Sequence, residues 1–482
     1  MTTRRLAGCI ALLVAAAAAE SSTQQARPVV AYRFQYTGNG SATASIEIGL
    51  AAPLAEARAL VMPRAIPMGY GEQRYDGFIN DVRVTTNDGR TLTPAREEGP
   101  RWTLPTGTAR ISYAVDLRQM ERDITTASDQ SRVRDGYLGA LGYSVFAFVD
   151  GQESFATKLR VAGPGAWPVF STLAPTWPAA AVAVEASAPD YYALADSQIV
   201  MGPRMVVRRL TEAPVPLYLA AYSEGVVDLD RVGRLATTAF QRTADYFGSV
   251  PFTHYTIHQE LLTPLTPRHE YGMSMEHLGS STFYLAETSG LTAASSPDDD
   301  ARVLYNFAHH IAHAWVPKRA YGHGYFPFQW ELAPVLDSIW FAEGFGQYAA
   351  IMAVAAGTPD PAAFRTRMLD RRFRANVASA PRFLKQLPLV DLSRVASTRY
   401  SEDFRTGRLV FSRGGLMAAA IDDRIQAESK GAKSLRDALR HLVSWTARER
   451  RAFSNDELPR LIRDATGVEV SAVIEEWLRP LP

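Results

Sequence analysis

The first half of the chain alternates apolar and polar residues, a pattern typical of β-strands. From residue 29 to residue 50, VVAYRFQYTGNGSATASIEIGL alternates on both sides of a Gly-Asn-Gly turn, which predicts a hairpin. DVRVTTNDGRTLTP repeats the pattern with Asp88 and Gly89 at its turn, and RWTLPTGTARISYAVDL continues it. We therefore expect a β-rich domain over residues 28–225, and nothing within it indicates catalytic chemistry.

From about residue 230 the apolar positions recur every three or four residues, which predicts helices. LDRVGRLATTAFQRTADYFG follows this period and stops at a glycine. A later helix has Ser296 as its N-cap, Pro297 at its first position, three aspartates in its first turn and Pro317 beyond its end. Further helices are expected over residues 335–356, 361–378, 407–428, 434–446 and 456–465.

At 482 residues the chain is too long for one compact core, so several domains are expected. The patterns predict an α+β multidomain protein, with the β-rich domain first and an α-helical domain over residues 358–482 last. The formal net charge of +1 provides no field that favours nucleic acid.

The N-terminus has the features of an export signal. Arg4 and Arg5 precede an apolar run from Leu6 to Ala19 that ends in small residues. The run is about 14 residues long, shorter than the roughly 18 that span a bilayer. We therefore predict a signal peptide over residues 1–19 and a periplasmic or secreted protein, with no membrane span after signal removal. Cys9, the only cysteine, lies inside this segment.

Eight of the nine histidines fall between His254 and His323. Two of them, His309 and His313 in YNFAHHIAHAWVPKR, are four residues apart, so a helix places both imidazoles on one face. That arrangement presents two nitrogen ligands to one metal ion. An isolated pair of this kind is more often simply packed or partly exposed.

The segment SIWFAEGFGQYAA predicts an apolar helix that carries one acid, Glu343. A carboxylate in apolar surroundings is costly unless it is paired or binds a metal. Together with His309 and His313, it would complete a three-ligand zinc site with one open position. Taken alone, Glu343 would be read as a structural ion pair or a surface acid.

HHIAHAWVPKR, WFAEGFGQY and the earlier YGMSMEHLGSST together resemble the glycyl aminopeptidase family of zinc metallopeptidases, which is related to the larger aminopeptidases and to leukotriene hydrolase. Trp315, Lys318 and Arg319 in the first segment are its more specific markers. The resemblance extends from the β-rich domain to the C-terminal helices. It implies a thermolysin-like domain over residues 226–357. Because the chain ends at Pro482, we expect no PDZ-like domain of the kind that many relatives carry.

The resemblance also implies roles for individual residues. GMSMEH would form an edge strand beside the cleft, where Glu276 would face the free amino group of a peptide or protein N-terminus. Gly272 and His277 belong to the same substrate-binding segment. A surface pair on an edge strand is the alternative for Glu276 and His277. The zinc ligands would be His309, His313 and Glu343.

The chain departs from the family pattern at two catalytic positions. His310 stands where these enzymes carry a glutamate that takes a proton from the attacking water and passes it to the leaving amine. Phe411, in LVFSRGGLM, stands where the family has a tyrosine that stabilises the oxyanion. Losing such a donor typically costs about 2.7–4 kcal/mol. Tyr400 could replace it only if its loop folds back.

These departures favour a degenerate member of the family, a pseudoenzyme that binds zinc and peptide N-termini with impaired hydrolysis. The alternative is an active zinc aminopeptidase that uses His310 or another group as its base. A third interpretation is a metal-free structural or interaction module. Zinc content and aminopeptidase activity distinguish the three.

Overall fold

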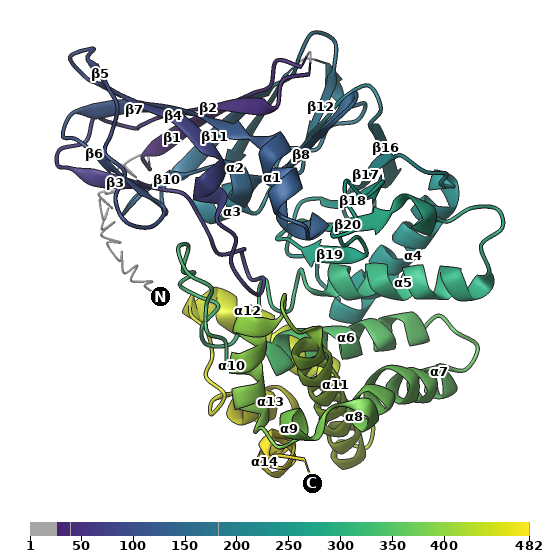
Figure 1. Ribbon diagram of the computed structural model, residues 1–482. Coiled ribbons are helices and arrows are strands. Elements are labelled where there is room, and N and C mark those ends of the chain that lie inside the picture. The colour runs from purple at the N-terminus through teal and green to yellow at the C-terminus, as the bar shows by residue number, and fades with distance from the viewer. Residues whose placement is uncertain (1–26, 39, 182, 482) are drawn as a thin grey trace, which may run out of the picture.

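The computed structural model describes residues 27–38, 40–181 and 183–481 (Figure 1). The predicted signal peptide and Asn39 of the predicted hairpin turn lie outside the described residues. The chain is a mixed α+β structure with several sheets in its first part and helices in its last, as the sequence predicts. Within the described ranges, no helix is both long enough and apolar enough to cross a membrane.

The largest sheet has the strand order β14-β11-β1-β2-β7-β4-β5. Its strands β1 and β2 form the predicted hairpin, with Tyr32 opposite Ile48 and Phe34 opposite Ile46. These four side chains are buried because alternate residues of a strand point to the same face of the sheet. The strands are β1 (Val29–Gln35), β2 (Thr43–Gly49), β4 (Ile79–Thr86), β5 (Thr91–Leu92), β7 (Thr108–Asp116), β11 (Ala156–Ala162) and β14 (Ala183–Ala188).

Two smaller sheets, of order β10-β3-β6 and β13-β12-β15-β9-β8, share the hydrophobic core of the largest sheet. Their strands are β3 (Arg58–Val61), β6 (Arg101–Leu104), β8 (Arg132–Arg134), β9 (Tyr137–Leu141), β10 (Phe148–Val149), β12 (Pro168–Ser171), β13 (Ala180–Ala181) and β15 (Gln198–Met201). Short helical segments between the strands are η1 (Tyr75–Phe78), α1 (Leu117–Asp123), η2 (Ala127–Asp129), α2 (Gly142–Val145) and α3 (Tyr191–Ala195).

A further sheet, of order β16-β17-β18-β20-β19, lies beside helices α4 and α5 (Figure 1). Strands β17, β18 and β20 are parallel, and β19 pairs antiparallel with β20 at the edge. GMSMEH thus forms an edge strand, as expected. The predicted domain boundary after residue 225 falls between β17 and β18 of this sheet. The elements are β16 (Val206–Thr211), β17 (Leu217–Ser223), α4 (Leu229–Phe247), β18 (Tyr255–Leu262), β19 (Met273–Glu276), β20 (Ser280–Ala286), η3 (Glu287–Ser289) and α5 (Pro297–Ala312).

Helix α5 begins as predicted. The Ser296 hydroxyl accepts a hydrogen bond from the Asp299 amide, and the Asp299 carboxylate accepts one from the Ser296 amide, so the two residues form a capping box. Pro297 occupies the first helical position. This local start determines the helical register that carries His309 and His313.

Helices α6 and α11 touch through glycines. A Cβ atom added at Gly414 would lie 2.0 Å from the carbonyl oxygen of Trp340, and one added at Gly344 would lie 2.5 Å from the amide nitrogen of Gly415. Only residues without a side chain allow backbones to approach this closely. The contact places Glu343 of α6 near Phe411 of α11. The helices are α6 (Ile339–Ala355) and α11 (Phe404–Glu428).

The C-terminal part is helical (Figure 1). The predicted helix over residues 361–378 is present, but its middle is a π-helical turn, η4 (Leu369–Arg374). Its flanks are α7 (Pro361–Met368) and α8 (Ala375–Ser379), and the other helices are α9 (Arg382–Lys385), α10 (Leu389–Arg399), α12 (Leu435–Glu449), α13 (Leu458–Thr466) and α14 (Ser471–Leu478).

Candidate metal centre

Two helices bring three ionisable side chains together. The Nε2 atoms of His309 on α5 and of His313 at the C-cap of α5 lie 2.8 Å apart, and the Oε2 of Glu343 on α6 lies 3.4 Å from the first and 3.5 Å from the second. Between 0 and 11% of each side chain is exposed, so water has little access. The three donor atoms face one point, as the sequence analysis expects.

The backbone orients the His313 ring. Its Nδ1 lies 2.7 Å from the Val316 carbonyl oxygen, which only accepts, so Nδ1 carries the hydrogen. A neutral His313 therefore has its lone pair on Nε2, facing His309. Such a bond at the far nitrogen is typical of metal-binding histidines. Gly346 makes room for the ring, because a Cβ there would lie 3.0 Å from the His313 Cε1.

These donors fit a zinc ion. Zinc binds imidazole nitrogen and carboxylate oxygen at about 2.0–2.2 Å, which places tetrahedral donors roughly 3.3 Å from one another. The observed separations of 2.8, 3.4 and 3.5 Å lie around that value.

A tyrosine that sequence analysis missed contacts this centre. The hydroxyl of Tyr70 donates a hydrogen bond of 3.0 Å to the Oε1 of Glu343, and it lies 3.3 Å from the Tyr325 hydroxyl. Tyr70 belongs to the segment between β3 and η1. The Lys318 ammonium group also contacts this segment, donating a 2.9 Å hydrogen bond to the Pro67 carbonyl oxygen. A tyrosine in a Gly- and Pro-containing loop gives no local signal of this role.

Strand β19 brings Glu276 to the same place. Ligand atoms of Glu276, His313 and Glu343 lie within 4.8 Å of one another. The His310 Nε2 lies 2.6 Å from the Ser274 hydroxyl, and its Nδ1 lies 3.8 Å from the Oε2 of Glu276. Among the described residues, this buried Nδ1 has no hydrogen-bond partner. Glu276 and His310 thus both border the three converging donors.

The other two residues of the substrate-binding segment lie elsewhere. The His277 Nδ1 lies 3.0 Å from Asp196, and its Nε2 lies 3.3 Å from the Thr282 hydroxyl. Consecutive strand residues point to opposite faces, so His277 is not brought to the converging donors with Glu276. Gly272 has a φ of +127°, and its amide donates a hydrogen bond to the Tyr284 carbonyl. Its role is to turn the backbone into β19.

Three aromatic rings cover the Glu343 side of the centre. Phe411 has its ring centroid 6.3 Å from that of Tyr70 and 5.9 Å from that of Tyr400, and the two tyrosine rings are 5.4 Å apart. The segment carrying Tyr400 therefore does fold back beside Phe411. Burial, with the negative charges of Glu343 and Glu276, raises the pKa of Tyr400, so its hydroxyl keeps its proton.

The buried charges adjust to one another. Burial alone would raise the pKa of Glu276, but the charge of His313 and the nearby His310 imidazole lower it to about 2. Burial would likewise raise the pKa of Glu343, yet His313 and His309 hold it well below its usual range. The pKa of His313 would fall on burial, but the two carboxylates raise it to about 9. Burial and the charge of His313 lower the pKa of His309 to about 3. The two carboxylates and one imidazolium have a net negative charge, which favours a cation, and a metal that binds His313 would displace its Nε2 proton.

A family model described as the Peptidase M61 N-terminal domain matches residues 31–203. The matched region lies in the β-rich part and does not include the histidines of α5. No curated protein sequence matches this chain.

The structure is similar to solved metallopeptidase structures. An aminopeptidase N family protein from Idiomarina loihiensis has a TM-score of 0.81 at 17% identity, over 94% of this chain and 76% of that chain. The M1 zinc metallopeptidase from Deinococcus radiodurans has a TM-score of 0.54 at 15% identity, over 95% of each chain. A variant of that enzyme bound to a Tyr-Ser-Ala substrate has a TM-score of 0.54 at 16% identity, also over 95% of each chain. At these identities the similarity shows a shared fold. The family-model match, the fold and the three converging donors together support a metallopeptidase-like protein.

Proposed function

We propose that this chain is an exported, zinc-binding protein of the glycyl aminopeptidase type, with a thermolysin-like central domain, whose cleft binds peptide N-termini and whose hydrolytic chemistry is impaired. The observation that carries the proposal is the convergence of His309, His313 and Glu343, with donor atoms no more than 3.5 Å apart. The zinc metallopeptidases among its structural neighbours support the choice of metal.

Each residue has a distinct task in this proposal. His309, His313 and Glu343 would hold the zinc ion, which when bound supplies Lewis acidity to polarise a carbonyl group and activate water. Glu276 carries a buried negative charge, which suits the α-ammonium group of a peptide. Tyr70 orients the Glu343 carboxylate by its hydrogen bond.

Hydrolysis would be impaired at two points. The imidazole of His310 is shorter and more rigid than the glutamate side chain that it replaces, and it is aimed differently from the same helical position. Its Nε2 also contacts Ser274. Phe411 has no hydroxyl, and losing one oxyanion donor typically costs about 2.7–4 kcal/mol.

One observation favours a second function, an active zinc aminopeptidase. The Nδ1 of His310, which has no hydrogen-bond partner among the described residues, is buried 3.8 Å from Glu276 and is available to accept a proton from water. Tyr400, whose ring centroid lies 5.9 Å from that of Phe411, is the candidate oxyanion donor in this alternative. A metal-free module is disfavoured, because burying two histidines and two carboxylates without an ion is costly.

The test is elemental analysis of protein purified without added metal, with peptide binding and release measured on the same samples. We expect about one zinc per chain, loss of zinc in His309→Ala, and binding of short peptides with little release of N-terminal residues. The control is His441→Ala on α12, because His441 belongs to neither cluster of potential metal-binding residues in the described structure, and this variant should keep the zinc. Zinc-dependent release that disappears in His310→Ala would favour the second function, and wild-type protein without zinc would refute both.

A further inference from the structure

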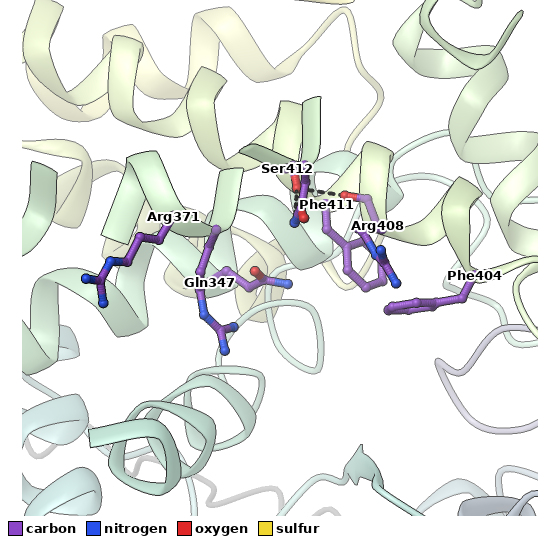
Figure 2. Close-up of a pocket in the computed structure, with 8 residues that line it drawn as sticks. Gln347, Arg371, Phe404, Arg408, Phe411 and Ser412 are labelled. Atoms are coloured by element: carbon purple, nitrogen blue, oxygen red, sulfur yellow. Dashed lines mark hydrogen bonds between the residues drawn. The ribbon is translucent and has the colours of Figure 1, made fainter. Parts of the chain in front are cut away.

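A pocket of about 330 Å³ adjoins the metal centre and is walled by α6, η4, α8 and α11 (Figure 2). Among the described residues that line it are three arginines, three neutral polar residues and two phenylalanines, and none is acidic. In Figure 2, Gln347 lies between Arg371 and Arg408. The size suits a side chain or a peptide end.

The pocket neighbours the metal centre along α6. Gln347 lies one turn beyond Glu343 on α6, and its amide oxygen accepts a 3.4 Å hydrogen bond from the Tyr305 hydroxyl. The Tyr305 ring separates the two regions, with its centroid 4.1 Å from the Arg372 guanidinium carbon and 6.1 Å from the His309 ring centroid. A peptide held at the metal centre would reach the arginines on the side of Phe411, which lines the pocket and has its ring centroid 6.3 Å from that of Tyr70, the residue that bonds Glu343.

The three arginines carry uncompensated charge. In the part of the chain that the structure describes, Arg371, Arg372 and Arg408 form no salt bridge, whereas Arg374 of the same π-helical turn pairs with Asp370. Arg372 rests on the Tyr305 ring, and the Arg408 guanidinium carbon lies 5.4 Å from the Phe404 ring centroid. Aromatic faces position the guanidinium groups without neutralising them.

The backbone places two arginines side by side. Arg371 and Arg372 lie in η4, whose π-helical hydrogen bonding adds one residue to a turn and rotates later side chains by about 100° around the helix axis. Phe373 anchors this turn, since a Cβ added at Gly415 of α11 would lie 2.4 Å from its ring. π-Helical turns of this kind are frequent at functional sites.

Both walls of the pocket supply neutral polar groups, Asn376 from α8 and Ser412 from α11. The Asn376 amide donates a 3.1 Å hydrogen bond to the Ser412 hydroxyl, which in turn donates to the Arg408 carbonyl. These groups leave the arginines as the only charges that face the pocket within the described residues.

We propose that this arginine pocket is a subsite that binds a carboxylate of a peptide held in the cleft. Guanidinium groups bind carboxylates through paired hydrogen bonds, and the absence of acids in the described lining favours an anion. The carboxylate comes from an acidic side chain or from the C-terminus of a short peptide. This inference rests on the proposed function, because it requires the cleft to bind peptides.

The test compares three tripeptides by calorimetry with zinc-loaded protein. Ala-Ala-Gln amide is neutral beyond its N-terminus, Ala-Ala-Glu amide adds a side-chain carboxylate, and Ala-Ala-Gln with a free C-terminus adds a terminal carboxylate. We expect at least one carboxylate peptide to bind about tenfold more tightly than the neutral amide. Which one does so identifies the source of the carboxylate.

The tighter binding of the carboxylate peptide should disappear in the double variant Arg371→Gln/Arg408→Gln. It should fall partly in Arg408→Gln alone. The zinc content should be unchanged in both variants. Arg374→Gln is the matched control, because Arg374 pairs with Asp370 outside the pocket and its loss should leave the preference intact. If all three peptides bind equally, or if the preference survives in the double variant, the subsite is refuted while peptide binding stands. If no peptide binds, the proposed function fails and the subsite fails with it.

Discussion

The hydroxyl of Tyr70 donates a 3.0 Å hydrogen bond to Oε1 of Glu343, a residue 273 positions later in the chain. The donor lies in the β-rich half, and the acceptor lies on α6 among the residues that face the candidate metal position. The contact therefore couples the placement of the N-terminal half to the geometry of the centre.

Replacing Tyr70 by phenylalanine should weaken zinc binding. The ring stays while the hydroxyl that orients Glu343 is lost, and losing such a partner typically reduces metal affinity about 10- to 100-fold. Competition with a chelator measures the change. Tyr325→Phe is the control, since the Tyr325 hydroxyl contacts Tyr70 and not Glu343 in the described structure. Equal zinc affinity in wild type and Tyr70→Phe would contradict the role assigned to this bond.

Restoring both family residues should restore activity. His310→Glu supplies a base worth about 10²- to 10⁴-fold, and Phe411→Tyr supplies an oxyanion donor worth about 10²- to 10³-fold. We expect zinc-dependent release from an alanine amide substrate to be greater in the double variant than in either single variant. The control, His310→Gln with Phe411→Tyr, has a side chain of glutamate shape without a base. A double variant no more active than wild type would show that the impairment lies elsewhere.

Replacing Gly414 by alanine should destabilise the protein. The added Cβ would lie 2.0 Å from the Trp340 carbonyl oxygen, so α11 and α6 must separate. We expect a loss of about 1–3 kcal/mol in the free energy of unfolding, measured with urea, and weaker zinc binding because α6 carries Glu343. The control is Gly77→Ala, where a Cβ meets no atom within 4 Å. Similar losses in the two variants would contradict the proposed contact.

Acid should weaken the buried pair of Arg132 and Glu260. Burial alone would raise the pKa of Glu260, but the charge of Arg132 and a hydrogen bond from His258 lower it to about 2, from 4.5 in the unfolded chain. A lowered folded-state pKa stabilises the protein above pH 4.5, and the stabilisation is lost as the pH falls towards 2. The shift corresponds to about 3 kcal/mol.

The measurement for this pair is urea unfolding of wild type and Glu260→Gln between pH 7 and pH 2. The stability difference between them should shrink by about 3 kcal/mol as the pH falls, because wild type alone loses the ionised carboxylate. Glu449→Gln, at an exposed acid of α12, should change stability little at any pH. A constant difference between wild type and Glu260→Gln would contradict the lowered pKa.

Much of the centre follows from local sequence. Ser296 and Pro297 start α5 through hydrogen bonds within a few residues, and a spacing of four then puts His309 and His313 on one face of the helix. Consecutive residues of a strand point to opposite faces of the sheet, so Glu276 and its neighbour His277 cannot both face the metal centre. This separation follows from the sequence once GMSMEH is taken as a strand. These features depend on helix and strand periods, which neighbouring residues determine.

The remaining features depend on contacts between distant segments. Whether Tyr70 reaches Glu343, and whether Tyr400 folds back on Phe411, depends on how a loop and a helix end pack against α6 and α11. The π-helical turn that joins Arg371 and Arg372 to the pocket is held by Phe373 against Gly415. Such contacts form only when the hydrophobic core brings separate elements together, and periodicity along the chain contains no information about them.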